Sequence, residues 1–227
     1  MAVALIVAAG RGERLGFGRP KALVPLCGRP MLEWSVDALR SVPAVEEIVI
    51  ALPAEALHRA PPGTVPVAGG QHRSHSVRAA LGASYAGGDP VIVHDAARPL
   101  ARPRLFIAVL EELERYGADA VIAAAPVTDT IKAVGADGRT VTQTLDRSQL
   151  WAVQTPQVFR RGAIERALSA GEDQLGAATD DAWLVERGGG VVRIVSAEPA
   201  NMKITTADDL RIAALLLSER MATQGSA

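Results

Sequence analysis

A glycine-rich segment near the start of the chain carries the residues best suited to bind phosphate. It reads LIVAAGRGERLGFGRPK over residues 5–21, so the short apolar run Leu5–Ala9 ends at Gly10. Glycine leaves backbone N–H groups uncovered, and cationic side chains such as Arg14 and Lys21 are interleaved with the glycines. A loop of this kind after a buried strand can bind polyphosphate through main-chain donors and charged side chains. The segment is therefore a candidate nucleotide-binding loop.

Two familiar phosphate-binding loops do not match this segment. A dinucleotide-binding loop needs G-x-G-x-x-G, but after Gly10 and Gly12 the third glycine position holds Leu15. A P-loop needs Ser or Thr after its lysine, and Lys21 is followed by Ala22. A glycine-rich surface turn with solvated arginines is the alternative interpretation, so the functional one depends on the rest of the chain.

A second segment, GGQHRSHSV over residues 69–77, resembles a ligand-binding turn. Glycines stand at a strand end and small polar residues stand at a helix start, where N–H groups and the hydroxyl of Ser74 or Ser76 can meet a ligand. His72 and His75 suggest a metal site, but no nearby carboxylate or cysteine completes the set. We therefore expect both to be solvated loop histidines.

A third segment, HDAARP over residues 94–99, directly follows the apolar run Val91–Val93. Open α/β sheets bind ligands at the carboxyl edge of their strands. Asp95 there could hold a metal or a substrate hydroxyl, and Arg98 could bind phosphate bidentately. The alternative is an internal Asp95–Arg98 pair that caps the helix beginning at Pro103.

Alternating strands and helices must position these three segments. Apolar runs predict buried strands, apolar residues at helical spacing predict helices, and their alternation predicts a mainly parallel, doubly wound sheet. The predicted strands are Leu5–Ala9, Glu47–Leu52, Thr64–Ala68, Val91–Val93, Ala120–Ala125 and Val191–Val195. The predicted helices are Met31–Leu39, one from Ser74, one from Pro103, one around Ile164–Leu168, Thr179–Glu186 capped by Thr179, and Ala207–Arg220 with a Thr206–Asp209 capping box.

Residues 128–150 interrupt the alternation. Ile131–Val134 and Val141–Leu145 flank a GADGR turn, a pattern typical of a β-hairpin. A two-stranded ribbon is marginally stable alone in water, so we expect it to pack on something, a second subunit being one option. Trp151–Phe159 then returns the chain to the body of the fold.

Composition limits the class of protein. The 227 residues are 48% hydrophobic, enough for a full core, and the formal net charge of −1 gives no general attraction to nucleic acid or anionic lipid. No apolar segment approaches the roughly 20 residues that span a bilayer, and the first apolar run lacks a basic leader. Cys27 is the only cysteine, so a reducing compartment is the simpler assumption. We expect a cytoplasmic protein without nucleic-acid or membrane partners.

Lysine is rare in this chain. Of 24 basic residues only Lys21, Lys132 and Lys203 are lysines, and each lies in a segment of interest. An ammonium group is compact whereas a guanidinium is a planar fork, so lysines retained among so many arginines can mark sites where that difference matters. Survival by chance under an arginine-rich codon bias is the alternative.

Eight segments together resemble one enzyme family. They are AAGRGERLG, RPKALVPLCGRPMLEWSV, GGQHRSHSV, VHDAARP, APVTDTIK, LDRSQLW, TPQVF and NMKIT, between Val3 and about Arg220. Their order and spacing are similar to those of 2-C-methyl-D-erythritol 4-phosphate cytidylyltransferases of the non-mevalonate isoprenoid pathway. The resemblance implies a Rossmann-like nucleotide-diphospho-sugar-transferase fold of the α/β class, a mostly parallel twisted sheet flanked by helices. It further implies one domain over residues 1–227, with residues 128–150 as a protruding β-arm that joins a homodimer.

The family reaction converts CTP and methylerythritol 4-phosphate to 4-diphosphocytidyl-2-C-methyl-D-erythritol and pyrophosphate, with Mg²⁺ as cofactor. The attacking phosphate oxygen is already anionic because its second pKa is about 6, so the reaction needs in-line positioning and charge neutralisation rather than a general base. The absence of a Ser/His/Asp or Cys/His set is consistent with this chemistry. The sequence assigns no metal ligands.

The resemblance also implies roles for individual residues. Arg14 and Lys21 would stabilise charge at the α-phosphate, and Arg147 and Lys203 would orient methylerythritol phosphate. The partner chain would complete each site because Thr130 and Arg147 lie on the arm, where we expect Lys132 to be structural. The remaining implied substrate contacts are Ala8, Ala9 and Gly10 along the nucleotide, Gly70, Gln71 and Ser76 at cytosine, Ala96 at the ribose, and Asp95, Arg98, Thr130 and Thr155 around the acceptor.

Three positions depart from the usual family pattern. Ala22 replaces a glutamine after the loop lysine, Gln71 replaces a common acidic residue, and Ala200 replaces an aspartate that could orient Lys203.

Two other functions stay open from the sequence. One is a cytidylyltransferase for another polyol phosphate such as ribitol 5-phosphate, and the other is a non-catalytic nucleotide-binding protein.

Overall fold

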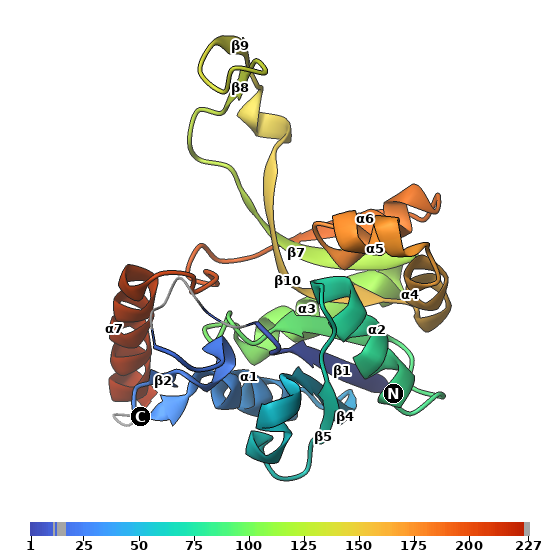
Figure 1. The fold of residues 1–227 in the computed structure, drawn as a ribbon, viewed down its shortest axis with the longest axis vertical. Helices are drawn as coiled ribbons and strands as arrows, with labels where there is room; N and C mark the ends of the chain where they lie inside the picture. Colours follow the sequence, from blue (N-terminus) through green and yellow to red (C-terminus); the bar gives the residue numbers. More distant parts are fainter. Residues whose placement is uncertain (11, 13–16, 225–227) are drawn as a thin grey trace.

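The fold is built around a twisted sheet of mostly parallel strands (Figure 1). The structure is a computed structural model, and it describes residues 1–10, 12 and 17–224. Within those residues the main sheet has seven strands in the order β11-β7-β10-β6-β1-β4-β5. Their bounds are Ala2–Val7 for β1, Val45–Leu52 for β4, Val65–Ala68 for β5, Val91–Asp95 for β6, Ala120–Pro126 for β7, Trp151–Phe159 for β10 and Val192–Ser196 for β11.

The predicted strands are confirmed, with shifted ends. β1 begins at Ala2 and ends at Val7, so Ala8 and Ala9 already belong to the turn after it. β10 pairs antiparallel with both β6 and β7 and interrupts the parallel order. The sequence did not place this strand in the sheet, because its position depends on pairing with β6 and β7, which are distant in the chain. Its insertion pairs Gln157, Val158 and Phe159 with β6.

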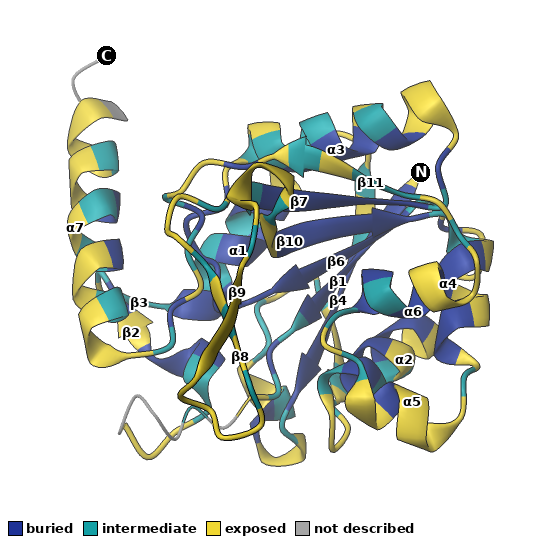
Figure 2. Ribbon diagram, turned by 90° about the horizontal axis from the view of Figure 1, so that it is seen from above, coloured by how far each residue is buried: buried dark blue, intermediate teal, exposed yellow. Residues whose placement is uncertain are grey.

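The sheet lies between two layers of helices (Figure 2). Apolar side chains of its strands alternate between these two layers. In β1, Ala4 and Ile6 pack toward α1 (Met31–Arg40) and α3 (Pro103–Tyr116), whereas Val3 and Leu5 pack toward the opposite layer. Burial on both faces explains why this strand reads as a continuous apolar run rather than an alternating one. The opposite layer contains α2 (Arg73–Ala83), α4 (Arg161–Leu168), α5 (Glu172–Ala177) and α6 (Asp181–Arg187).

The last helix, α7 (Ala207–Gln224), lies beside the sheet and packs on a separate apolar cluster (Figure 1). Its predicted capping box is confirmed. Asp209 Oδ2 accepts hydrogen bonds from the N–H groups of Thr205 and Thr206, and Thr206 Oγ1 accepts from the Asp209 N–H. The small sheet beneath α7 consists of β2 (Pro25–Leu26) and β3 (Arg29–Pro30), and short 3-10 turns cover Lys21–Leu23 (η2), Ala54–Arg59 (η3) and Arg147–Gln149 (η4).

One predicted helix cap is wrong. α6 begins at Asp181 rather than Thr179, and its cap is Asp180, whose Oδ1 accepts the Trp183 N–H. Aspartate and threonine are both good cap residues, and the choice between them depends on where the chain turns into the helix. Here that turn comes one residue later than the sequence predicts.

A hairpin projects from the sheet between β7 and β10 (Figure 1). Its strands are β8 (Lys132–Val134) and β9 (Val141–Thr144), which pair antiparallel and confirm the predicted hairpin. Lys132 Nζ donates to Thr144 Oγ1 across the pair at 2.7 Å. Val134 and Val141 are 49% and 55% exposed, so the ribbon presents apolar side chains to solvent within this chain.

None of the helices in the described part of the chain combines the length and the apolarity that crossing a bilayer requires.

Candidate functional site

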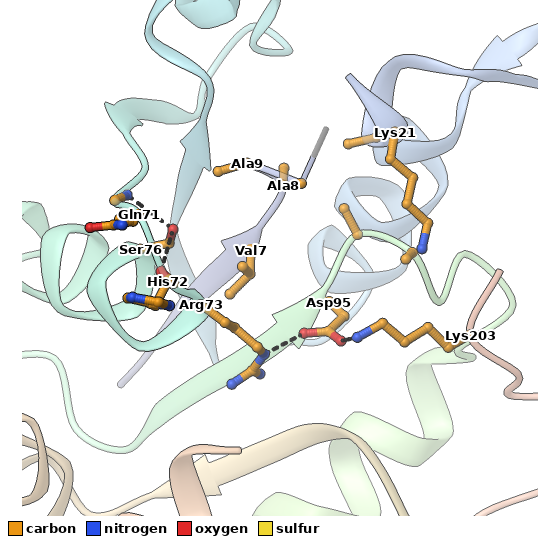
Figure 3. A pocket seen from close by; sticks show the side chains of 15 residues that line it. Val7, Ala8, Ala9, Lys21, Gln71, His72, Arg73, Ser76, Asp95 and Lys203 are labelled. Carbon is orange, nitrogen blue, oxygen red and sulfur yellow. Dashed lines mark hydrogen bonds and ion pairs between the residues drawn. The ribbon is translucent and has the colours of Figure 1, made fainter. Parts of the chain in front are cut away.

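A cleft opens at the carboxyl edge of the sheet, where β1 and β6 end and α2 begins (Figure 3). It has a volume of about 220 Å³. The turn after β1 forms one wall and is closed by a hydrogen bond from the Lys21 N–H to the Gly10 carbonyl. The lining residues include ten of the predicted site residues: Ala8, Ala9, Gly10, Lys21, Gly70, Gln71, Ser76, Asp95, Ala96 and Lys203. Ala22, one of the departures from the family pattern, lines it as well.

Lys21 and Lys203 both line this cleft, although they lie near opposite ends of the chain. Lys21 comes from the turn η2 and Lys203 from the segment before α7. Figure 3 shows their side chains extending toward the same opening. Arg14, the other predicted loop cation, lies outside the described residues.

Glycines pack closely on their neighbours just before α2, where Gly70 lines the cleft. A Cβ atom on Gly69 would overlap the Cβ of Ala9, and one on Gly70 would overlap the Cβ of His75. The Gly70 N–H donates to Ser76 Oγ at 3.1 Å, and that hydroxyl donates to the His72 carbonyl. Ser76 therefore holds the glycine turn in place, a contact in addition to the substrate contact that the resemblance implies.

This close packing gives a prediction for Gly69. We expect Gly69→Ala to lower the affinity for nucleotide at least tenfold, because the new methyl group forces the Gly69 turn and the Ala9 turn apart. The matched control is Gly82→Ala in α2, where the added Cβ meets no atom within 4 Å. The control should raise stability by up to about 1 kcal/mol and leave binding unchanged. Nucleotide titration calorimetry and thermal unfolding check both, and unchanged binding in Gly69→Ala would contradict the close approach.

Asp95 connects the cleft to a chain of charges. Its Oδ2 accepts from Lys203 Nζ at 2.6 Å, and its Oδ1 accepts from Arg73 Nε at 3.0 Å. Burial raises the pKa of Asp95, but the charges of Arg73 and Lys203 outweigh burial and hold that pKa well below its usual range. Asp95 is therefore ionised at neutral pH and orients the Lys203 ammonium. This contact supplies the carboxylate partner that Ala200 cannot.

The segment NMKIT is fixed on both sides of Lys203. Asn201 is buried and donates to Gln154 Oε1 at 2.7 Å and to the Thr155 carbonyl at 2.9 Å. On the other side, the Ile204 N–H donates to the Ala97 carbonyl at 2.8 Å. These bonds tie the segment to β10 and to the turn after β6, so the Lys203 backbone is held next to Asp95.

Arg98 and Asp95 do not form the internal ion pair that the sequence left open. In the described structure Asp95 contacts Arg73 and Lys203, whereas Arg98 Nη1 donates to the Asn201 carbonyl at 2.7 Å. Arg98 Nη2 donates to the Val153 carbonyl at 3.3 Å, and the residue is only 8% exposed. The Asp95–Arg98 pair does not form because Arg98 meets two carbonyl acceptors instead, Val153 on β10 and Asn201 in the segment before α7.

Thr155 does not line this cleft, but it lines an adjoining cavity that shares Asp95 and Lys203 with it. It is buried, and its Oγ1 accepts the Asp95 N–H at 3.0 Å and lies 3.0 Å from His94 Nδ1. His94 is fully buried and its ring lies edge-on to Phe106. Within this chain, Thr155 and His94 support the backbone that carries the functional carboxylate.

His94 makes stability depend on pH. Burial lowers its pKa from 6.5 to about 4, so the unfolded chain binds this proton more readily than the folded chain between those values. Stability is then lost as pH falls from about 6.5 through 4, and linkage gives a loss of about 2 kcal/mol between pH 7 and pH 5. Urea unfolding at both values should show this loss, and His94→Gln should reduce it. An equal loss in the variant would contradict the assignment.

The expectation for the two histidines of GGQHRSHSV is wrong for one of them. His75 lies in α2 with its Nε2 2.8 Å from Glu172 Oε2, whereas His72 is exposed just before the helix. The sequence could not reveal this carboxylate because Glu172 belongs to α5, far along the chain.

The arm residues do not line the cleft formed by the described part of their own chain. Thr130 and Arg147 are exposed on the hairpin, and Arg147 Nη1 donates to the Thr128 carbonyl. One chain therefore brings together the nucleotide turn, Asp95 and Lys203, but not Thr130 or Arg147.

Comparison with known proteins identifies the family. The family model described as "IspD: 2-C-methyl-D-erythritol 4-phosphate cytidylyltransferase" matches residues 2–219. The chain belongs to this family. Among curated members, the cytidylyltransferase of Rhodococcus jostii is 49% identical over 221 residues, covering 96% of this chain and 95% of its own, and that of Nocardia farcinica is 47% identical over 226 residues, covering 97% and 95%.

Solved structures of this cytidylyltransferase family share the fold. The 4-diphosphocytidyl-2C-methyl-D-erythritol synthase of Anaerococcus prevotii matches with a TM-score of 0.81 at 29% identity, covering 96% of this chain and 98% of that one. The enzyme of Thermus thermophilus matches with a TM-score of 0.78 at 34% identity, covering 95% and 98%. The Rossmann-like α/β fold expected from the family resemblance is confirmed.

The sequence does not reveal one charged pair at this cleft. Arg73 lies on the cleft between Asp95 and the buried Asp181, and the sequence indicates neither Arg73 nor Asp181 as a site residue. The available signals were weak, namely the arginine inside GGQHRSHSV and the two adjacent aspartates at residues 180–181. An isolated charge of either sign is usually a solvated surface residue, and only the fold brings these two together.

Proposed function

We propose that the cleft binds CTP on its glycine-rich side and methylerythritol 4-phosphate beside Asp95 and Lys203. The protein then transfers the cytidylyl group to that acceptor, giving 4-diphosphocytidyl-2-C-methyl-D-erythritol and pyrophosphate, the reaction for which its closely similar relatives are named. The observation that carries the assignment of the site is the convergence of Lys21 and Lys203 on one cleft that Gly10 and Gly70 also line, with open space where a Cβ of Gly10 would stand.

The arrangement suits an in-line displacement at phosphorus. An acceptor phosphate oxygen attacks the α-phosphorus of CTP, the bond to the bridging oxygen of the β-phosphate breaks, and pyrophosphate leaves with the electron pair. The attacking oxygen is already ionised, so the site needs no general base. Fixed cations at both phosphates lower the barrier by holding them in line and by neutralising charge that develops during transfer.

The cations divide between the two phosphates. Lys21, with Arg14 from the same loop, stabilises charge on the triphosphate side. Lys203, oriented by Asp95, holds the acceptor phosphate, and its 42% exposed side chain leaves the ammonium accessible to a ligand. Arg147 and Thr130 complete the acceptor side from the arm of a second subunit.

The homodimer is proposed through the arm. Support comes from the exposed apolar side chains Val134 and Val141 on the hairpin, with Trp151 and Val153 at the start of β10. Exposed apolar groups on a thin ribbon favour contact with a second protein surface, and a self-complementary contact gives a twofold dimer. A cytoplasmic location is likewise proposed, supported by the single cysteine of the chain.

Mg²⁺ is proposed as the cofactor, held chiefly by substrate. The described residues contain no group of three or more His, Cys, Asp or Glu side chains suited to a metal. Asp95, the buried carboxylate of the cleft, has both oxygens in contact with Arg73 or Lys203. Such a site fits an ion bound mainly to triphosphate oxygens and water, as Mg²⁺ often is in nucleotide enzymes. The bound ion supplies further neutralisation of phosphate charge.

A single assay tests the proposed function. Purified protein is incubated with CTP, Mg²⁺ and each of a panel of polyol phosphates, and pyrophosphate is measured. We expect release with methylerythritol 4-phosphate, little with ribitol 5-phosphate or erythritol 4-phosphate, and none after chelation of the metal. A strong preference for another polyol phosphate would reject the acceptor, and absence of release from every acceptor would reject catalysis.

A further inference from the structure

Four charged side chains form a continuous chain from the cleft into the protein. Lys203 contacts Asp95, Asp95 contacts Arg73, and Arg73 Nη1 donates to Asp181 Oδ2. The four come from the segment before α7, the end of β6, the start of α2 and the start of α6. Figure 3 shows the Arg73–Asp95–Lys203 part of this chain along one side of the cleft. The two positive and two negative charges sum to zero. Loss of the Asp181 charge at one end therefore changes which partners Arg73 and Asp95 have near the other end.

Asp181 is too deeply buried to contact a substrate. It is only 1% exposed, and among the described residues its Oδ1 has no hydrogen-bond partner. Burial raises the pKa of Asp181, and the charge of Arg73 acts in the opposite direction. A buried carboxylate destabilises the fold unless a positive charge pairs with it. In the described structure the one ionic contact of Asp181 is with Arg73. Arg73 is therefore the side chain that joins Asp181 to Asp95.

The contacts of Arg73 show what this pairing achieves. A guanidinium tends to bind both oxygens of one carboxylate in a bidentate fork. Arg73 instead divides its donors, with Nε on Asp95 Oδ1 and Nη1 on Asp181 Oδ2. The second oxygen of Asp95 is thereby left to Lys203, which it contacts at 2.6 Å.

We infer that Asp181 is a positioning residue that prevents Arg73 from taking both oxygens of Asp95 and so keeps Lys203 oriented toward the acceptor phosphate. The inference rests on the proposed role of Lys203 in holding that phosphate. Without the Asp181 charge, Arg73 turns its free donor to Asp95 Oδ2 and displaces the ammonium. Asp181 thus acts from α6 on a substrate that it never touches.

Steady-state kinetics of Asp181→Asn provide the first test. Because one charge-assisted contact is worth about a ten- to hundredfold change, we expect kcat/KM for methylerythritol 4-phosphate to fall by that factor while KM for CTP stays within about twofold. The matched control is Asp180→Asn, which removes a neighbouring charge but keeps a good helix cap and lacks contact with Arg73. Equal losses in the two variants would reject the inference in favour of a general charge effect.

A second substitution separates positioning from simple structural support. If the defect comes from Arg73 capturing Asp95, removing Arg73 as well should relieve it. We expect Asp181→Asn with Arg73→Gln to recover kcat/KM for the acceptor at least about threefold over Asp181→Asn alone, because neighbouring sites are coupled. The double variant also removes both partners of a buried pair, so it serves as the foldable variant if Asp181→Asn is unstable. In that case the double variant should keep kcat/KM for the acceptor within about tenfold of the wild-type value. A larger loss would overturn the inference.

Lysine NMR gives a readout that does not require turnover. The chain has three lysines, so protein labelled with [ε-13C]lysine gives three side-chain signals, and Lys203→Arg assigns one of them. We expect the Lys203 signal to move in Asp181→Asn and to stay in place in Asp180→Asn. An unmoved Lys203 signal in folded Asp181→Asn would overturn the inference.

Lys203→Ala distinguishes the two levels of the proposal. Wild-type acceptor kinetics in Lys203→Ala would reject the proposed role of Lys203 and the inference with it. A defective Lys203→Ala beside a fully normal Asp181→Asn would reject only the positioning role of Asp181.

Discussion

Replacing Lys21 by alanine is expected to abolish pyrophosphate release while leaving the fold intact. The Lys21 side chain lines the cleft beside the uncovered backbone of Gly10, where the triphosphate is proposed to bind. A fixed cation at a developing phosphate charge typically contributes two to three orders of magnitude to kcat, so we expect a loss of about 10³-fold. The backbone bond from the Lys21 N–H to the Gly10 carbonyl survives the substitution, so thermal unfolding should change little.

The control for this experiment is Arg59→Ala, which removes an exposed cation in η3 away from the cleft. Its activity should equal that of wild type. Full activity in Lys21→Ala would show that charge neutralisation at the triphosphate does not come from this lysine, and the proposed mechanism would be wrong.

Arg147→Ala is expected to have the second largest effect, a loss of about 10²-fold in kcat/KM for the acceptor. Arg147 does not line the cleft formed by the described part of its own chain, because it lies on the projecting hairpin. A large effect on acceptor use therefore requires a second subunit to bring this guanidinium to the acceptor phosphate. Arginine binds phosphate bidentately, so Arg147→Lys should restore only part of the activity.

The control on the same hairpin is Arg139→Ala, an exposed residue of the GADGR turn. It tests whether any loss of positive charge on the arm weakens acceptor use. If Arg139→Ala and Arg147→Ala lower kcat/KM equally, the arm acts through its overall charge and not through a specific phosphate contact.

The sheet could be predicted from sequence because its signals are local. Buried strands such as β1 read as short apolar runs, and the capping box before α7 is contained within a few residues. β10 could not be placed because its position depends on pairing with β6 and β7, which are distant in the chain. That one insertion brings β10 carbonyl groups to Arg98 and Asn201 and places Thr155 beside Asp95.

The candidate site likewise contains residues that the sequence could predict and residues that it could not. The glycine turns and Asp95 could be predicted because glycine and charge at strand ends have a direct physical meaning. The rarity of lysine was also informative, since Lys21 and Lys203 line one cleft and Lys132 bonds across the hairpin. The Arg73–Asp181 pair could not be predicted, because nothing in the sequence near either residue indicates that α2 and α6 present opposite charges to each other.

Three residues of this chain differ from those expected from the family resemblance, and the structure shows the surroundings of each. Ala200 lacks the carboxylate that is common at this position, and the structure shows Asp95 in contact with Lys203 instead. Gln71 lines the cleft and is exposed, so it can still meet a nucleotide through its amide or backbone. Ala22 is buried in η2, where its methyl group cannot make the hydrogen bonds of a glutamine amide.

Mixing two inactive variants tests most directly whether cations of two subunits meet at one reaction centre. Lys21→Ala damages the nucleotide side, and Arg147→Ala damages the arm. In a mixed dimer one site receives both defects, and the other combines an intact nucleotide side with an intact arm. Random exchange of subunits should therefore restore about a quarter of wild-type pyrophosphate release, because half of the dimers are mixed and each has one good site. If exchange is complete by mass spectrometry and the mixture stays as inactive as its parents, the shared site is contradicted.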